Sequence, residues 1–268
     1  MFRKYLIGIF IFFCLQHNSI CVAQTDSINN VIDFSLDGFG NLYVAKKTSE
    51  FIKINSEGKV MRINSRKDLG VPTSINAENP LRILIFYREQ GWLIVADNQL
   101  AFQFEIDLKQ IGFTDPTLTA NSFDGGIWVF DRGNGTLNKV MLNATGVEPA
   151  GSIDLRQILF TELNPQRLIT DGNYLVLSNN STLYVFDRYA TYIRKIELDE
   201  DPISLNIEGT QVNASTHNFV YSCDIRYLSE PSKFASLHQA AVLKSAVTKS
   251  KLYELTPGDV LRVSPSKK

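Results

Sequence analysis

Carboxylates and histidines are the side chains of this sequence whose types suit metal-assisted chemistry. Together they can hold a divalent cation that polarises a carbonyl group or activates a water molecule. Beyond residue 30 the histidines are His217 and His238, and no H-x-x-E-H or H-E-x-x-H spacing brings them together. The aspartates are spread along the chain, mostly beside Gly or Asn: Asp33, Asp37, Asp97, Asp124, Asp131, Asp171, Asp187 and Asp224. A carboxylate in that context accepts backbone N–H bonds in a turn, so this spacing favours structural turns over a metal centre.

Nucleophiles and phosphate-binding loops give no stronger signal. The sequence has no G-x-S-x-G elbow and no G-x-x-x-x-G-K-[ST] loop. The segment from Asp33 to Asn41 lacks the alternating ligands and the closing Glu of a calcium loop. Cys223 has no Cys–His spacing that would activate its thiol, and its alternating apolar surroundings favour a small buried side chain. We therefore predict no catalytic residue, no metal and no cofactor, and we favour a protein that is not an enzyme.

Aromatic residues are a better guide to binding. Tyr43, Trp92, Trp128 and Tyr174 each follow a turn that contains glycine. They either fill the space between packed sheets or reach a surface, where they would form a platform for a sugar or a peptide. Further predicted contact residues lie in the divergent segment 228–250, and these are Phe234 and His238.

Short strands separated by turns must position these side chains. Runs rich in β-branched and aromatic residues directly follow glycine-containing turns, over residues 39–45, 90–96, 125–131, 171–177 and 208–213. The glycines supply the positive φ that tight turns require. Another strand precedes each turn, and the resulting units start near Val31, Pro80, Pro116, Pro165 and Pro202.

The repeat predicts the fold. The pattern of Phe51–Ile63 returns at Leu252–Val263, and four short strands in about 35 to 50 residues are typical of a propeller blade. We predict an all-β fold, a β-propeller of five to six four-stranded blades over residues 31–264, with six favoured and a short tail at 265–268. The tail hairpin should pair near Ile28–Leu36 and close the ring. An aligned β-sandwich is the alternative fold, but it would not repeat one strand order.

The composition of residues 228–250 departs from this pattern and favours an irregular insertion with helical character. The segment belongs either to a degenerate sixth blade or to an insertion in a fifth blade. Its irregularity makes it a natural contact surface.

The N-terminal segment has the features of an export signal. Arg3 and Lys4 precede the uncharged apolar run Tyr5–Leu15, which is shorter than the roughly twenty residues that a spanning helix needs. Small residues before Gln24 predict cleavage there, which assigns residues 1–23 to a signal peptide and 24–30 to a linker. A lipoprotein signal acylated at Cys21 is the rival interpretation. We predict an exported chain without a transmembrane span, located in the periplasm or at the outer membrane, with the cell surface as an alternative.

The charge balance excludes one class of partner. The formal net charge is −1, from 27 Lys and Arg against 28 Asp and Glu. No basic patch stands out that would neutralise a phosphate backbone, so we predict no nucleic-acid partner. After signal cleavage Cys223 is the remaining cysteine, and the protein must rely on its core rather than on an internal disulfide.

Two strings carry a family resemblance. Asp37–Val44 (DGFGNLYV) and Phe51–Val60 (FIKINSEGKV) resemble blades of the NHL and gluconolactonase-like propellers. The resemblance implies the propeller fold and says little about function. The Val-Ala-Gln end of the signal is similar to those of exported Bacteroidota proteins. Asp26-Ser27-Ile28 also resembles the short sequence at which such bacteria attach O-glycans, which would place a glycan on Ser27.

Three hypotheses of function follow. We favour a non-catalytic cell-envelope propeller that acts as a protein-binding or scaffold module with an envelope protein as partner. A carbohydrate-binding propeller with a glycan partner is the alternative, and it requires an exposed Trp92 or Trp128. The third hypothesis is a metal-dependent hydrolase or lactonase. Enzymes of the resembled fold commonly hold a metal at the mouth of the central channel, so this hypothesis requires converging carboxylates.

Overall fold

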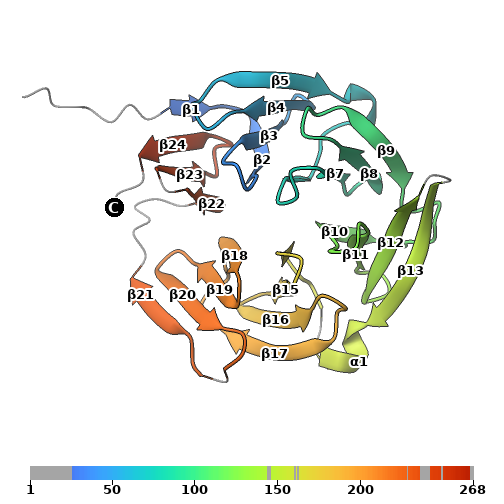
Figure 1. Ribbon diagram of the computed structural model, residues 1–268, viewed down its shortest axis with the longest axis vertical. Coiled ribbons are helices and arrows are strands. Elements are labelled where there is room, and N and C mark those ends of the chain that lie inside the picture. The colour runs from blue at the N-terminus through green and yellow to red at the C-terminus, as the bar shows by residue number, and fades with distance from the viewer. Residues whose placement is uncertain are drawn as a thin grey trace, which may run out of the picture.

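The computed structural model describes residues 26–143, 146–159, 161, 163–227, 229–235, 242–248 and 250–265. Within these residues the strands form six four-stranded antiparallel sheets, arranged as blades around a central channel (Figure 1). From the inner strand outward, blade one contains β2 (Val31–Leu36), β3 (Leu42–Lys46), β4 (Glu50–Ile54) and β5 (Val60–Ser65). Blade two contains β6 (Ser74–Asn76), β7 (Ile83–Tyr87), β8 (Trp92–Ala96) and β9 (Phe102–Asp107). Blade three contains β10 (Pro116–Asn121), β11 (Ile127–Asp131), β12 (Thr136–Asn143) and β13 (Gly146–Asp154). Blade four contains β14 (Arg167–Thr170), β15 (Tyr174–Asn179), β16 (Thr182–Asp187) and β17 (Tyr192–Glu197). Blade five contains β18 (Ser204–Glu208), β19 (Gln211–Ser215), β20 (Phe219–Asp224) and β21 (Ser232–Ala235). Blade six contains β22 (Lys244–Val247), β23 (Lys251–Leu255), β24 (Leu261–Pro265) and the N-terminal strand β1 (Asp26–Ile28). The predicted propeller with six blades is confirmed.

Burial follows the position of a strand within its blade. The middle strands β7 and β11 are buried at every residue, because neighbouring blades cover both of their faces. The outer strand β5 is almost entirely exposed. Apolar clusters accordingly lie between adjacent blades. One of them joins Tyr43 and Phe51 of blade one to Ile83 and Ile94 of blade two.

The N-terminal strand closes the ring. β1 pairs antiparallel with β24, so that Ile28 lies opposite Leu261 and Ser27 opposite Arg262. The ring therefore begins inside the segment 24–30 that the sequence assigned to a linker. The tail pairs with the outer strand β1 rather than with the inner strand of blade one. Ser27, the predicted glycan site, is exposed on this strand; the predicted signal peptide at 1–23 lies outside the described residues.

Blade two begins earlier than predicted. Its inner strand is β6, and the run from Leu81 to Phe86 that the sequence assigned to the first strand falls mainly on the second strand, β7. Pro80 therefore lies in the turn between them. The inner strand has three residues, which are too few to show an alternation of apolar and polar side chains. Two side chains of blade one fix this strand in place. The Asp33 carboxylate accepts the Ile75 N–H at 2.9 Å, and the Ser35 hydroxyl accepts the Ala77 N–H at 2.9 Å.

The segment 228–250 is not a helical insertion where the structure describes it. β21 completes blade five and β22 opens blade six. The described helices lie elsewhere: α1 (Leu155–Leu159) connects blades three and four, and the 3-10 helix η1 (Lys67–Leu69) connects blades one and two. Residues 236–241, which include His238, lie outside the described residues.

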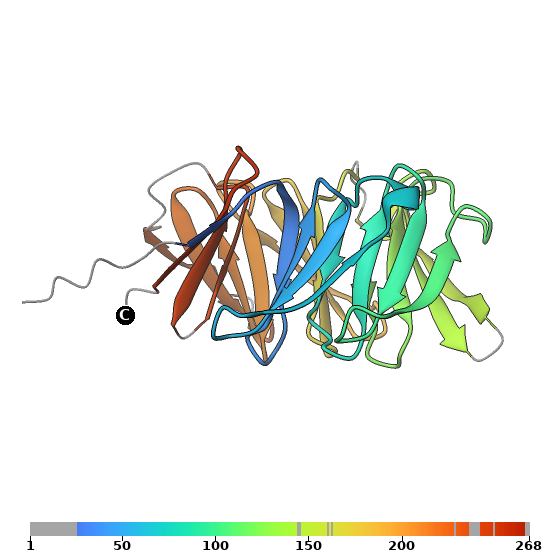
Figure 2. The ribbon, with the colours of Figure 1, turned by 90° about the horizontal axis from the view of Figure 1, so that it is seen from above.

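The topology gives the ring two distinct faces. Each blade has an even number of antiparallel strands, and its outer strand leads to the next inner strand, so every inner strand starts on the same side. We call that side the upper face and the opposite side the lower face. Turns between first and second strands and between third and fourth strands lie on the lower face. Figure 2 shows the ring edge-on, with the turn between β2 and β3 on the lower side. No helix in the described part of the chain is long and apolar enough to cross a bilayer.

Candidate functional site

The central channel and the space between blades five and six together form a cavity of about 1840 Å³. The inner strands of all blades contribute to its wall. Charged, hydroxylated and amidic side chains line it together with apolar ones, whereas the clusters between the blades are apolar. The channel can therefore hold polar ligands or water.

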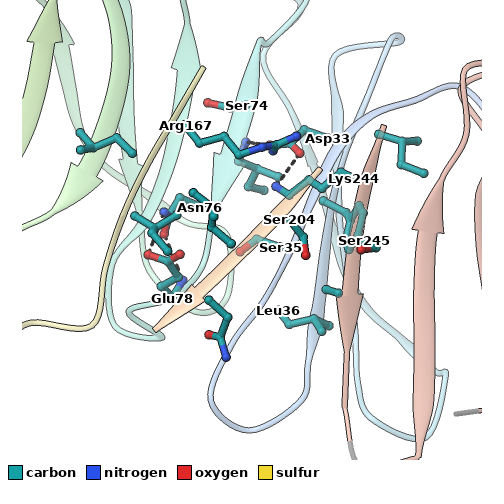
Figure 3. Close-up of a pocket in the computed structure, with 18 of the residues that line it drawn as sticks. Asp33, Ser35, Leu36, Ser74, Asn76, Glu78, Arg167, Ser204, Lys244 and Ser245 are labelled. Atoms are coloured by element: carbon teal, nitrogen blue, oxygen red, sulfur yellow. Dashed lines mark hydrogen bonds and ion pairs between the residues drawn. The ribbon is translucent and has the colours of Figure 1, made fainter. Parts of the chain in front are cut away.

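A charged network crosses the upper half of the channel (Figure 3). Lys244 Nζ of blade six donates to Asp33 Oδ1 of blade one at 2.7 Å, and Asp33 Oδ2 accepts the Ile75 N–H of blade two. Arg167 of blade four donates through Nε to the Pro202 carbonyl at 3.0 Å and through a terminal nitrogen to the Leu243 carbonyl at 3.1 Å. These contacts link blades that are far apart in the sequence.

Burial and a neighbouring charge act on the pKa of Arg167 in opposite directions. Desolvation lowers the pKa of its guanidinium, and the Asp33 carboxylate opposes that shift. The ordinary pKa of an arginine lies far above neutrality, and an arginine in a protein stays protonated. The channel therefore contains a fixed positive charge at this position.

Glu78 lies in the turn after β6 and lines the lower half of the channel. Its carboxylate is accessible to channel water, yet protein surrounds it, and this enclosure raises its pKa above the ordinary value of 4.5. Asn76 Nδ2 donates to the carboxylate at 3.1 Å, and this bond and the Lys244 charge partly offset the shift. The nearby Asp171 carboxylate adds to the increase.

Glu78→Gln is expected to stabilise the protein at neutral pH and to have no charge effect in acid. Since the folded-state pKa lies above the unfolded value of 4.5, the folded state holds the proton more tightly. The stability that this group contributes is complete below pH 4.5 and is lost as pH rises through the raised folded-state pKa. Thermal unfolding of both proteins between about pH 4 and pH 8 checks the prediction. A difference that is constant over that range would contradict it.

The lower face carries exposed apolar side chains in every blade. They extend from turns or strand ends on this face, and their exposed fractions are Phe39 76%, Leu81 79%, Phe123 38%, Tyr189 66%, Tyr227 59% and Val247 65%. On the upper face the exposed large apolar residues among those described are Val71 and Leu243. The remaining exposed large apolar residues lie on the outer strands β5, β17 and β21.

Cations accompany the aromatic rings in blades three to five. The rings of Phe123 and Tyr189 pack edge to face with centroids 5.3 Å apart. The Arg188 guanidinium lies 5.1 Å and Lys139 Nζ 5.0 Å from the centroid of Phe123. These contacts hold exposed rings in place, which lowers the entropy that a binding partner would have to remove.

A shallow pocket of about 490 Å³ opens beside this cluster, between blades four and five. Tyr174 and Tyr189 contribute aromatic surface, and Asn173, Asp187 and Arg188 contribute polar groups. Arg188 donates to the Asn173 side chain. Such a combination of a ring and fixed polar groups suits a sugar.

The predicted aromatic residues do not converge on one surface. Tyr43 is fully buried and Trp92 is half-buried against the same cluster, while Trp128 is 5% exposed in the cluster between blades three and four. Neither tryptophan is therefore the exposed residue that the carbohydrate hypothesis required. Trp92 lies in the third strand of its blade and Trp128 in the second, so the two are not equivalent as the repeat suggested. Tyr174 lines the shallow pocket, and Phe234 is exposed on the outer strand β21.

The aspartates serve as turn and backbone acceptors, as their sequence context predicted. Each accepts at least one backbone N–H bond: Asp33, Asp37, Asp97, Asp124, Asp131, Asp171, Asp187 and Asp224. Within the described residues, no group of three or more His, Cys, Asp or Glu side chains is arranged to hold a metal ion.

Sequence reasoning missed the residues that distinguish the two openings of the channel. Arg167 and Lys244 begin inner strands but are surrounded by unremarkable sequence. Phe39 and Leu81 did carry a signal, since each is a large apolar residue inside a turn of polar, Gly or Pro residues. Such residues cannot be buried by the turn itself.

Comparison with known proteins gives the fold class. No family model and no curated protein matches the sequence. A catalytically inactive virginiamycin B lyase from Staphylococcus aureus, solved with quinupristin, has a TM-score of 0.63 at 10% identity over 90% of this chain and 88% of that chain. A streptogramin B lyase scores 0.60 at 10% identity over 91% and 88%, and the WD40 domain of Neurospora crassa Pan2 scores 0.57 at 10% identity over 90% of both chains. At such identities the likeness shows the propeller fold alone.

Proposed function

We propose that this chain is a non-catalytic module of the cell envelope that docks another protein through the lower face of its propeller. The observation that carries the proposal is the distribution of exposed apolar side chains: every blade contributes one to the lower face. Exposed apolar surface of this extent marks interaction sites in soluble proteins. Aromatic residues and arginines, which dominate binding energy at interfaces, come together there in blades three to five.

The cellular setting is part of the proposal. The basic and apolar N-terminus supports export to the periplasm or the outer membrane, and the blade strings support membership of the NHL and gluconolactonase-like group. A rigid ring with variable turns suits recognition, because the scaffold fixes the turns while their residues vary.

The lower-face triple variant Phe39→Ser, Leu81→Ser, Tyr189→Ser is expected to lose the partner. Truncating an interface anchor typically costs at least 2 kcal/mol, so recovery should fall by more than tenfold. The measurement is quantitative mass spectrometry after capture of the tagged protein from solubilised envelope. The matched control removes exposed side chains from the outer strands, away from the lower-face turns, in Met61→Ser, Ile63→Ser, Phe234→Ser.

A protein recovered with wild type and with the outer-strand control, but lost with the lower-face variant, is the expected partner. If both triple variants lose the partner protein equally, docking at the lower face is contradicted. Recovery of no specific protein with wild type would contradict it as well.

Carbohydrate binding is a second candidate, favoured by the shallow pocket with Tyr174 and Tyr189. A stacking ring beside fixed amide, carboxylate and guanidinium groups can orient sugar hydroxyls. Binding of a free oligosaccharide that disappears with Tyr189→Ala and survives Phe39→Ala would select this candidate over protein docking.

A further inference from the structure

The charged side chains that line the channel are separated by sign along its axis. Three cations lie in the upper half, at the starts of inner strands or in an upper turn: Arg88, Arg167 and Lys244. Four carboxylates lie at the lower ends of inner strands or just after them: Asp37, Glu78, Asp171 and Glu208. Asp33 and Glu254 are the exceptions, because they are acids in the upper half, Glu254 near the end of β23 opposite Ser245.

Asp33 does not neutralise this group of cations. Its two carboxylate oxygens are engaged by Lys244 Nζ at 2.7 Å and by the Ile75 N–H at 2.9 Å. Asp33 and Glu254 together supply two negative charges against three cations, and Asp33 forms its ion pair with Lys244. The upper half of the channel keeps a net positive charge.

Arg167 has carbonyl partners but no acid within ion-pair distance in the described chain. Its guanidinium donates to the Pro202 and Leu243 carbonyls, which fix its plane and leave further N–H groups toward the channel. Figure 3 shows the side chain extending toward Asp33 and Lys244. A desolvated guanidinium without a carboxylate in direct contact gains strongly from an anion, because charges interact more strongly away from bulk water.

Further donors surround this position. Arg88, half-buried in the upper turn of blade two, makes no side-chain hydrogen bond or ion pair with any described residue. The hydroxyls of Ser74 and Ser204 are also without a hydrogen-bond partner in the part of the chain that the structure describes. The upper half of the channel thus offers guanidinium and hydroxyl donors together.

We propose that the upper half of the channel binds an oxyanion, the carboxylate or phosphate group of a small ligand, with Arg167 as its principal donor. A guanidinium presents its donors in a planar fork that matches both groups. Arg88 adds charge, and the serine hydroxyls add neutral hydrogen bonds. The cavity of about 1840 Å³, which includes the whole channel and the space between blades five and six, leaves room for a small ligand in its upper half. This site is separate from the lower face and does not depend on protein docking there.

The test uses inorganic phosphate and succinate as probes of the purified chain, measured by calorimetry at constant ionic strength against chloride. We expect at least one probe to bind in preference to chloride, and the preferred probe tells phosphate from carboxylate ligands. Arg167→Gln should weaken that binding by about tenfold, the effect of losing one charge-assisted hydrogen bond. Arg88→Gln should weaken it as well, through charge.

Arg62→Gln is the matched control, because Arg62 is exposed on the outer strand β5 and donates to the Met61 carbonyl. It should bind the probe as wild type does. Circular dichroism establishes that each variant is folded, and Arg88→Gln carries the test if Arg167→Gln does not fold. The proposal is overturned if neither probe binds better than chloride, or if the folded channel variants bind as tightly as Arg62→Gln.

Discussion

Asp33→Ala is expected to lower the free energy of unfolding by about 3 kcal/mol, the low end of the range for removing one partner of a buried pair. The Asp33 side chain is 11% exposed and that of Lys244 28%, so water compensates only in part. The substitution also frees the Ile75 N–H and removes the charge that opposes the desolvation of Arg167. Lys244 would then lose its ion-pair partner, and Arg167 would lose the Asp33 charge.

Chemical denaturation at neutral pH measures this effect, with Asp115→Ala as the control. Asp115 pairs with Arg132 at the surface, where the two side chains are 38% and 43% exposed, and such pairs contribute at most about 1 kcal/mol. Similar decreases in the free energy of unfolding of the two variants would show that the channel network does not hold the blades together.

A chain that begins at Asn29 is expected to be less stable than one that begins at Asp26 by about 3 kcal/mol. The shorter chain loses the three paired positions of β1, each hydrogen bond being worth about 1 kcal/mol, and it uncovers part of the cluster around the fully buried Leu261. Removal of β1 also exposes the edge of β24, which would then be free to pair with another molecule.

Thermal unfolding and light scattering of the two chains check this prediction. The shorter chain should unfold roughly 6 to 12 °C lower, given the usual scaling for domains of this size, and should associate on heating. Equal melting temperatures would mean that the ring closes without the N-terminal strand.

The existence of the strands and turns could be predicted because their signals are local. The turns Asn55–Lys59 and Thr256–Val260 have the same backbone bonds, with the first residue donating to the fifth carbonyl at 2.9 and 3.0 Å. That similarity is why Phe51–Ile63 and Leu252–Val263 look alike. Glycine at residue 58 and Asp259 both take positive φ, 92° and 57°.

The position of a strand within its blade could not be predicted in the same way. β4 and β5 are the third and fourth strands of blade one, whereas β23 and β24 are the second and third strands of blade six. A hairpin has the same turn chemistry at either position. The shift of blade two has the same origin, since the turn before Trp92 gives no information about how many strands precede it.

The channel network depends on ring closure and therefore had no sequence signal. Asp33 and Lys244 are 211 positions apart, and they meet because blade six is placed beside blade one. The exposed turn residues did have a local sequence signal, because Phe39 and Leu81 are large apolar residues among residues that form turns. What could not be inferred was that such residues from all blades gather on one face.

Site-specific photo-crosslinking tests docking at the lower face most directly. A photoreactive phenylalanine analogue is placed singly at Phe39, Leu81 or Tyr189 on the lower face, and at Val71 or Leu243 on the upper face, in cells that make the protein. We predict covalent adducts with one partner protein from the lower-face positions and none from the upper-face positions. Adducts from Val71 or Leu243 without any from Phe39, Leu81 or Tyr189 would contradict the proposed function.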